Sequence, residues 1–275
     1  MLNCPDITLN NGVKIPQLGL GVFRSEPGQE TAGAVTAALE VGYRHIDTAK
    51  AYNNEKDVAK GIKDSGIKRE EIFITSKVPT EDIEAKLTYE ASMQALDKLD
   101  TDYIDLYLLH WPITNYIEAW EVLMRLYEEK KFRAIGVSNF EVHHLQALEQ
   151  RGLLTPAVNQ IELHPTFQQK EVKPYSESKG IFVEAWSPLG GRDHLLIADP
   201  VIANIAKKHG KTGAQVIIRW HLQTGNIVIP KSVKPERIAD NAKVFDFELD
   251  GEDMQAIAAM DTNKRSYWDP NRWNT

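Results

Sequence analysis

Four side chains with acid-base chemistry follow short apolar runs in the first 110 residues of the chain. Asp47 ends the run over residues 45–47, and Tyr52 lies in the polar loop behind it. Lys77 ends the next apolar run and His110 ends the one after that. Each residue alone could be a charge that solvates a loop. Because parallel strands of a barrel send their C-terminal ends to one rim, where catalytic groups collect, the four together indicate a shared site.

The segments that must position these residues alternate between strand-like and helix-like patterns. The expected strands are apolar through their length, as strands buried on both faces should be, and cover residues 18–21, 45–47, 72–77, 104–110, 133–137, 157–161, 181–186 and 227–229. Helices are expected over residues 30–41, 56–64, 83–99, 117–129, 142–150, 171–179, 201–209 and 214–223, and another starts within 231–241. Eight such units predict an α/β fold, a (β/α)8 TIM barrel.

Two further features lie near the ends of the chain. Asn11-Gly12 between the short runs 7–9 and 13–15 predicts a β-hairpin, which we expect to close the bottom of the barrel. Residues 263–275 lose periodicity but carry Tyr267, Trp268 and Trp273, and such aromatic content predicts a C-terminal tail that packs on the body. We therefore predict a single domain over residues 1–275 with this hairpin, the tail and extra helices beyond the eight units.

At this point the chain resembles the aldo-keto reductase family. The matching segments lie in the family's order along nearly the whole chain: Gly42 to Glu55, Thr75-Ser76-Lys77, His110-Trp111-Pro112, Gly136 to Asn139, Asn159 to Pro165, and Ile229 to Ser232. Among its branches the chain is most similar to the prokaryotic 2,5-diketo-D-gluconate reductases, because of Gly21-Val22-Phe23, Pro188-Leu189-Gly190 and Arg219 to Gln223. The resemblance implies NADPH-dependent reduction of carbonyl compounds.

The four rim residues fit the chemistry that the resemblance implies. Hydride reduction of a carbonyl needs a proton at the oxygen, and a free phenol with a pKa of about 10 is a reluctant donor. We expect the ammonium of Lys77 to lower the pKa of Tyr52, the proton donor, while Asp47 holds Lys77 in place. His110 would orient the substrate carbonyl by a hydrogen bond.

The resemblance also implies a nicotinamide cofactor bound across the rim. Ser138, Asn139 and Gln160 could hold its carboxamide by donor-acceptor pairing, and Trp186 falls where the family stacks an aromatic ring on the nicotinamide, although it could equally be a core aromatic. The loop with Ser187, Leu189 and Gly191 has the backbone freedom to fold over a pyrophosphate.

A basic stretch follows the last expected strand. Lys231, Ser232 and Arg237 would surround an adenosine 2′-phosphate and so favour NADPH over NADH. Val233 and Asn241 belong to the same cofactor-binding stretch. The alternative is an exposed basic helix start, although basic charge there opposes the helix dipole.

The substrate pocket is the region where the chain departs from the family pattern. Val78-Pro79-Thr80 stands where many members have an aromatic residue, and the loops after Lys77 and Trp111 are short, which predicts an open pocket. Phe23, Trp111 and Trp268 would supply apolar walls. Lys50 could attract an anionic substrate or could point to solvent, as most lysines do. We expect tolerance for small polar carbonyls, α-dicarbonyls and keto sugars.

Composition excludes several other functions. The 32 basic and 39 acidic side chains of the 275 residues give a net charge of −7 without a basic cluster, so a nucleic-acid partner is not expected. The single cysteine, Cys4, suits a reducing compartment, and no apolar run is long enough to cross a membrane. We expect a cytoplasmic monomer whose partner is a small carbonyl substrate.

Two alternatives to a reductase stay open from the sequence. One is a regulatory member of the same fold, like ion-channel β subunits, which sense a nucleotide while bound to a partner. The other is an unrelated barrel enzyme with Asp47 and His110 on a metal, but no ligand spacing accompanies them, and we expect no metal. A Rossmann motif around Gly19 and Gly21 fails, because Arg24 occupies the position of its third glycine.

Overall fold

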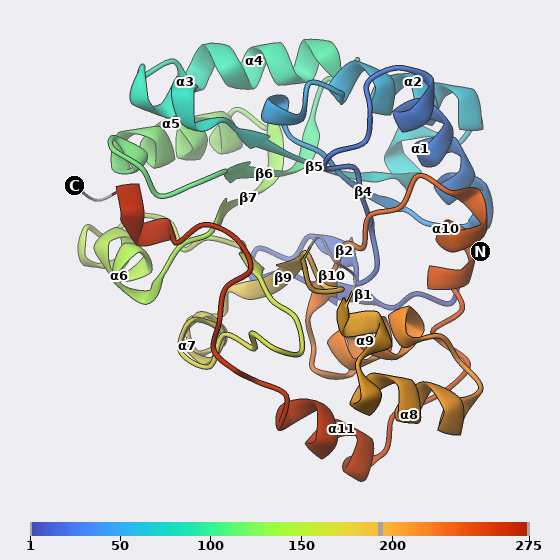
Figure 1. The fold of residues 1–275 in the computed structure, drawn as a ribbon. Helices are drawn as coiled ribbons and strands as arrows, with labels where there is room; N and C mark the ends of the chain where they lie inside the picture. Colours follow the sequence, from blue (N-terminus) through green and yellow to red (C-terminus); the bar gives the residue numbers. More distant parts are fainter. Residues whose placement is uncertain (1, 192–194, 274–275) are drawn as a thin grey trace.

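The computed structural model describes residues 2–191 and 195–273, and its centre is a parallel sheet that curls into a barrel (Figure 1). The eight strands lie side by side in sequence order: β3 (Leu20–Gly21), β4 (His45–Asp47), β5 (Phe73–Val78), β6 (Ile104–Leu109), β7 (Phe132–Ser138), β8 (Val158–Glu162), β9 (Phe182–Trp186) and β10 (Ile227–Val228). Parallel bridges from Leu18 to Val228 and from Gly21 to Lys231 join the first strand to the last. The predicted eight-stranded barrel is thus confirmed.

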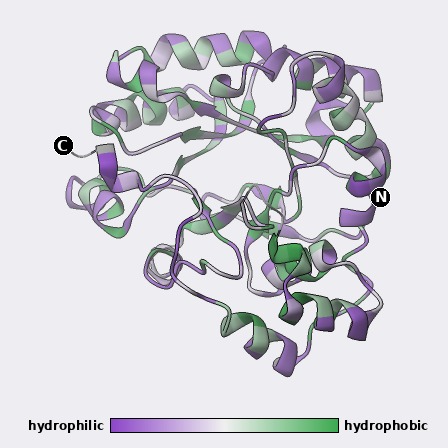
Figure 2. Cartoon of the chain, viewed as in Figure 1, coloured by the Kyte–Doolittle hydropathy of each residue, from purple (hydrophilic) through white to green (hydrophobic). Residues whose placement is uncertain are grey.

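Helices surround this sheet on its outer side (Figure 1). They are α1 (Gln29–Val41), α2 (Glu55–Ser65), α3 (Thr80–Glu84), α4 (Thr88–Lys98), α5 (Tyr116–Glu128), α6 (Val142–Gln150), α7 (Val172–Ser178), α8 (Pro200–His209), α9 (Gly213–Gln223), α10 (Pro235–Asn241) and α11 (Gly251–Ala258). Short 3₁₀ turns are η1 (Lys50–Tyr52), η2 (Arg69–Glu71), η3 (Leu195–Ala198) and η4 (Pro270–Trp273). Outer helices such as α4 and α11 carry both hydrophilic and hydrophobic residues (Figure 2), because one face packs on the sheet while the other meets water.

One helix expectation is wrong. The single helix expected over residues 83–99 is two helices, α3 and α4, because Lys86 between them adopts a left-handed backbone with φ of 59°. The amide of Leu87 then turns back to the Asp82 carbonyl at 2.7 Å. Helix α11, which the periodicity analysis did not predict, begins at a capping box in which the Asp250 side chain accepts from the Asp253 amide.

The N-terminal hairpin closes one end of the barrel, as predicted. Strands β1 (Asp6–Thr8) and β2 (Lys14–Pro16) pair antiparallel, and Leu9 and Ile15 join side chains from inside the barrel in one buried cluster. We call this cluster the barrel floor, and its other buried members are Phe73, Leu106, Leu108, Ala134, Ala157, Val158 and Ile227. The floor keeps water out of the interior below the rim.

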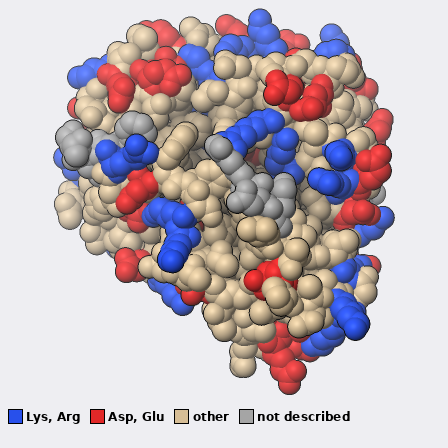
Figure 3. All heavy atoms as spheres, in the orientation of Figure 1, with Lys and Arg blue, Asp and Glu red and all other residues tan. Residues whose placement is uncertain are grey.

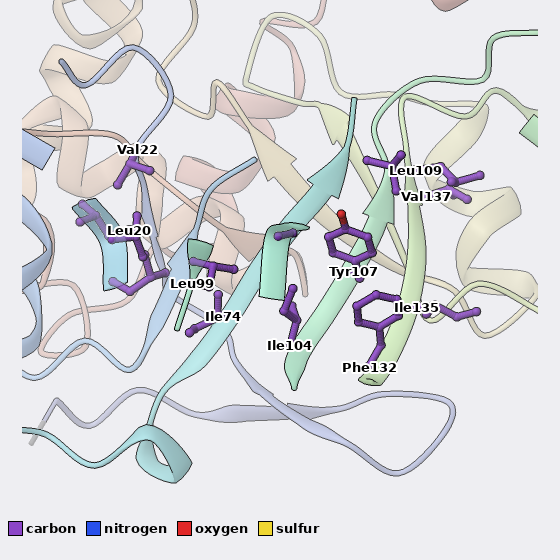
Figure 4. Close-up of a cluster of buried hydrophobic side chains, with 14 of the residues drawn as sticks. Leu20, Val22, Ile74, Leu99, Ile104, Tyr107, Leu109, Phe132, Ile135 and Val137 are labelled. Atoms are coloured by element: carbon purple, nitrogen blue, oxygen red, sulfur yellow. The ribbon is translucent and has the colours of Figure 1, made fainter. Parts of the chain in front are cut away.

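A second apolar core lies between the strands and the outer helices. Figure 4 shows its central part, in which Tyr107 and Leu109 of β6 lie near Ile135 and Val137 of β7. The Tyr107 ring stacks on Phe132 with centroids 4.4 Å apart. Full burial of a large apolar side chain stabilises a fold by about 1.5–3 kcal/mol, so this layer fixes the strands that carry the polar rim residues.

No described helix has both the length and the apolar character needed to cross a bilayer. On the face drawn in Figure 3, acidic and basic side chains are interspersed around the margin, and much of the surface between them is uncharged. The charges therefore form no large field of one sign on this face.

Candidate active site

Asp47 and Lys77 form a buried ion pair at the rim of the barrel. Asp47 ends β4, and its register partner on β5 is Thr75, so the inward-facing Lys77 lies one layer nearer the rim. The Lys77 Nζ donates to both Asp47 carboxylate oxygens and to the Thr48 carbonyl, each at 2.8 Å. Burial by itself lowers the pKa of Lys77, but the charge of Asp47 and the hydrogen bonds to it are the strongest opposing effects, and the pKa is raised above its usual range. Lys77 is therefore held as an ammonium.

Tyr52 and His110 lie next to this pair, so the structure brings the four predicted residues together. The Lys77 Nζ is 5.1 Å from the centroid of the Tyr52 ring, and the His110 ring meets Tyr52 edge to face at 5.8 Å. Phe23 packs on the other side of Tyr52 with centroids 5.0 Å apart. A phenol, an ammonium and an imidazole thus share one small volume at the C-terminal ends of β4, β5 and β6.

The expected direction of the Tyr52 pKa shift is not found. Burial raises the pKa of Tyr52 to about 12, and the opposing effect of the Lys77 ammonium does not overcome it. Tyr52 is therefore a protonated phenol at neutral pH. Burial, reinforced by the Lys77 charge, lowers the pKa of His110 to about 3, so His110 is a neutral imidazole.

The residues expected to hold a carboxamide form one hydrogen-bonded group beside the four. Ser138 Oγ donates to the Gln160 carbonyl at 2.9 Å, and Asn139 Nδ2 donates to the His110 carbonyl at 3.0 Å. The Trp186 indole N–H donates to Asn139 Oδ1 at 2.9 Å. These bonds link the ends of β7, β8 and β9 and fix the indole ring at the rim.

The loop after β9 is turned back on itself. Ser187 has a φ of 51°, its carbonyl accepts from the Gly190 amide at 3.0 Å, and its hydroxyl accepts from the Gly191 amide at 3.3 Å. Leu189 packs against the apolar core outside the strands. The predicted loop residues therefore surround a turn whose backbone faces the cleft described below.

The basic stretch after β10 meets the rim beside β3, where the barrel closes. Lys231 bridges to Gly21, which must be a glycine because a Cβ there would lie 2.8 Å from the Ile229 carbonyl oxygen. Ser232 is buried, and its Oγ accepts from the Lys234 amide at 3.2 Å. Arg237 is exposed on the first turns of α10. The remaining predicted members are Val233, partly buried against the core, and Asn241, buried at the end of α10.

A cavity of about 690 Å³ opens beside the rim. Its lining residues are Phe23, Arg24, Thr166, Gly190, Gly191, Leu195, Leu196, Asp199, Ser266, Tyr267 and Trp268. Phe23 is 44% exposed and Trp268 is 56% exposed, and the Trp268 ring lies 6.2 Å from Trp111. Two of the three predicted apolar wall residues, Phe23 and Trp268, thus line this cavity, whereas Trp111 is buried behind Trp268 and does not line it.

Lys50 has neither of the two roles expected for it, that of a free cation that attracts an anionic substrate or that of a solvated surface charge. Its Nζ lies 2.6 Å from Asp82 Oδ2, and the side chain is only 18% exposed. Asp82 lies on α3, one residue before the helix start expected at residue 83, and no local sequence signal places it beside Lys50. The positive charge of Lys50 is locally compensated.

The C-terminal tail packs across the barrel, as predicted for its described part (Figure 1). Arg265 forms an ion pair with Glu141, and the Ser266 amide donates to Glu162 Oε1 at 2.6 Å. The Tyr267 ring then meets Trp186 at 5.1 Å. Residues 274–275, and the side chain of Trp273, lie outside the described part of the chain.

Sequence reasoning missed several residues of this region. Arg24, Asp199 and Tyr267 line the cavity but were given no site role, and Glu184 lies buried below Gln160. Glu184 carried a usable signal, because an acid in the middle of an apolar strand is rarely buried without a partner. The others follow only from the path of the loops.

Comparison with known proteins agrees with this geometry. The model of the Aldo/keto reductase family matches residues 17–262. Glyoxal reductase of Bacillus subtilis is 50% identical over 260 residues, which are 94% of each chain, and methylglyoxal reductase DkgA of Escherichia coli is 46% identical over 99% of each.

Solved structures give the same result. An aldo/keto reductase from Brucella melitensis superposes with a TM-score of 0.90 at 47% identity, covering 95% of this chain and 99% of that one. A Gox0644 mutant in complex with NADPH superposes with a TM-score of 0.91 at 44% identity, covering 98% of both chains. On the family match, these identities and the geometry of the rim, the chain belongs to the aldo/keto reductase family and is an NADP-dependent oxidoreductase.

Proposed function

We propose that this enzyme uses NADPH to reduce small polar aldehydes and ketones, α-dicarbonyls and keto sugars to alcohols, with Tyr52 as the proton donor. The observation that carries the proposal is the convergence of a phenol, an ammonium and a neutral imidazole at one rim. Two relatives of nearly full coverage are named for reducing glyoxal and methylglyoxal, which are α-dicarbonyl compounds.

NADPH, when bound, supplies the hydride. The residues present fit this cofactor, because Ser138, Asn139 and Gln160 offer donors and acceptors beside the Trp186 ring. Lys231 and Arg237 offer two exposed cations in the stretch after β10, the strand that pairs with β9, which suits the extra phosphate of NADPH. The loop from Ser187 to Gly191 would cover the dinucleotide between these two regions.

The protonation states assign the remaining roles. Tyr52 keeps its proton at neutral pH and can release it to the carbonyl oxygen as negative charge builds there, because an alkoxide is far more basic than a phenolate. Lys77 stabilises the phenolate that forms, and Asp47 holds Lys77 in position. His110, as a neutral imidazole, can donate one hydrogen bond to the same oxygen.

The oxygens of Asp47 are already committed. Both accept from Lys77, and one also accepts from Gln160 Nε2 at 2.8 Å. Asp47 is therefore better suited to holding an ammonium than to binding a metal, which disfavours the alternative of a metal-dependent barrel enzyme.

The test is consumption of NADPH followed by its absorbance with glyoxal, methylglyoxal, a diketo sugar, a short aldehyde and a bulky hydrophobic ketone. We expect turnover of the first four with modest differences, because an apolar pocket distinguishes two substrates that differ by one methylene by only about 1–3 kcal/mol. Turnover of only the bulky ketone would contradict the substrate class, and turnover of none would contradict the function.

A further inference from the structure

A second carboxyl lies inside the barrel below the candidate catalytic residues. Glu184 is in the middle of β9 and has no exposed surface. Its Oε2 accepts a hydrogen bond from Gln160 Nε2 at 3.2 Å, and the same amide nitrogen donates to Asp47 Oδ2 at 2.8 Å. One amide group thus connects the two carboxyls.

The other oxygen of Glu184 lacks a hydrogen-bond donor among the described residues. His45 Nε2 lies 3.6 Å from Oε1, beyond hydrogen-bond distance, and 3.1 Å from Thr75 Oγ1 instead. A buried carboxylate with one oxygen uncompensated is costly, whereas a carboxylic acid in the same place carries no net charge.

The charges around Glu184 also favour the carboxylic acid over the carboxylate. The titratable groups that face it are His45 and Asp47 from β4, Tyr52 from η1 and Lys77 from β5. Its register neighbours Gln160 on β8 and Ile227 on β10 add no charge.

Burial lowers the pKa of His45 to about 3, so His45 is neutral, and Tyr52 is a neutral phenol. Among the described residues, Lys77 is then the one cation that faces the two carboxyls, and it is already paired with Asp47. An ionised Glu184 would leave this dry interior with an uncompensated negative charge.

We propose that Glu184 is a positioning residue that stays protonated at neutral pH, so that Asp47 remains the only anion paired with Lys77 and Tyr52 remains able to release its proton. The catalytic part of this proposal rests on the function proposed above. Its basis is the Gln160 bridge between the carboxyls, the oxygen without a donor and the single cation.

Loss of the Glu184 proton has a defined consequence for catalysis. The new negative charge raises the pKa of Tyr52, because Glu184 is one of the groups whose charge disfavours the phenolate. It also competes with Asp47 for the Gln160 amide. Reduction should therefore slow as Glu184 ionises, and burial together with the charge of Asp47 raises the pKa of Glu184 to about 8.

The first test compares wild type with Glu184→Gln in urea unfolding without cofactor at pH 5.5 and pH 8.5. The unfolded chain releases the Glu184 proton above its ordinary pKa of 4.5, whereas the folded chain keeps it until about pH 8. Rising pH across this window therefore favours the unfolded state of wild type, and glutamine removes the effect. We expect the unfolding constant of wild type relative to the variant to rise at least about tenfold between the two pH values.

The matched control is Glu162→Gln, which removes another fully buried acid from the neighbouring strand β8. Its Oε2 likewise has no donor among the described residues, but its Oε1 accepts from the Ser266 amide at 2.6 Å and lies 3.1 Å from His164 Nε2, so the control isolates the effect of the Gln160 bridge to Asp47. It reports the effect of losing a buried carboxyl in general. The proposal would be overturned if the ratio of the unfolding constant of wild type to that of Glu184→Gln did not change with pH.

A second measurement needs no activity and no stable variant series. Infrared spectroscopy of wild type at pH 7 should show a protonated carboxylic acid band that shifts in deuterium oxide and disappears in Glu184→Gln. Absence of such a band in wild type would overturn the proposal even if the variant failed to fold.

The third test is the pH dependence of kcat with methylglyoxal. Wild type should lose activity with a midpoint near pH 8, and Glu184→Gln should keep its neutral-pH activity into the alkaline range. A fall that is the same in both proteins would remove the positioning role. If no carbonyl compound is turned over at any pH, the proposed function fails, while the unfolding and infrared tests still decide the state of Glu184.

Discussion

The two ends of the barrel interior are built from the same strands but have opposite chemistry. The floor is a cluster of apolar side chains, such as Ile15, Leu106 and Val158, sealed by the hairpin. Nearer the rim, the inward positions hold a layer of buried polar residues that includes His45, Asp47, Thr75, Lys77, Gln160 and Glu184. The floor contributes stability by burial, whereas the polar layer costs desolvation energy and is retained for chemistry.

This contrast shows how one strand can serve both purposes. Inward positions alternate with outward ones, so on β5 the floor residue Phe73 is followed two positions later by Thr75 and then by Lys77. A change at the floor should therefore alter stability with little effect on chemistry, and a change at the rim should do the reverse.

The largest effect is expected at the rim from Tyr52→Phe. The substitution removes the proton donor and almost no volume, and general acid catalysis contributes about 10²–10⁴-fold, so kcat should fall by that factor. NADPH binding, measured by fluorescence titration, and the melting temperature should stay close to wild type. Tyr89→Phe, at an exposed position of α4, is the control. Near wild-type turnover would assign the proton donor elsewhere.

Leu108→Ala should give the complementary result at the floor. Leu108 is fully buried in this cluster, and a Leu-to-Ala change in a core costs about 2–5 kcal/mol of unfolding free energy. Urea unfolding should show this loss, while kcat measured well below the melting temperature should change less than about threefold. A large loss of kcat in protein shown to be folded would mean that the floor also positions the polar layer.

Lys231→Ala combined with Arg237→Ala should alter cofactor choice at the outer edge of the rim. Each charge-assisted contact to a phosphate contributes about 1.5–3 kcal/mol, so the Michaelis constant for NADPH should rise about tenfold or more while that for NADH changes little. The exposed Lys207→Ala on α8 is the matched control for lost positive charge. Equal increases for both cofactors would refute the phosphate site.

The smallest effect is expected when both charges of the Lys50–Asp82 pair are removed together, in Lys50→Gln with Asp82→Asn. Because the two opposite charges lie 2.6 Å apart and largely cancel at the distance of a substrate, the pair should add little attraction for an anionic substrate. The ratio of kcat/KM for a carboxylate-bearing carbonyl to that for a neutral aldehyde should change less than about twofold at low salt, and stability should fall by less than about 1 kcal/mol. A larger change that disappears at high salt would restore Lys50 as a substrate-attracting cation.

The sequence was most informative where the physics is local. Apolar runs separated by helical periodicity predicted the eight strands, and polar residues at their ends predicted that Asp47, Tyr52, Lys77 and His110 meet, because parallel strands share one rim. The hairpin followed from its Asn-Gly turn.

The sequence was less informative where distant segments decide the outcome. The pairing of Lys50 with Asp82 depends on the turn at Lys86, and no local signal places those side chains together. The direction of the Tyr52 shift depends on how much burial the whole rim imposes, which outweighed the nearby ammonium. The protonation state proposed for Glu184 depends on its contact with Gln160 and, through it, with Asp47, and these residues lie on other strands.

The join between β3 and β10 bears on how the chain folds. Residues around Gly21 and Lys231, which are 231 − 21 = 210 positions apart, meet through isolated bridges, with the Gly19 amide bonded to the Val228 carbonyl at 2.9 Å. Contacts between such distant segments form late, because the long intervening loop loses the most chain entropy. Amide hydrogens at Gly19 and Val228 should therefore exchange with solvent earlier than those in the middle of β6. Because the proposed phosphate site begins at Lys231, a bound dinucleotide should slow that exchange by holding the two ends of the sheet together.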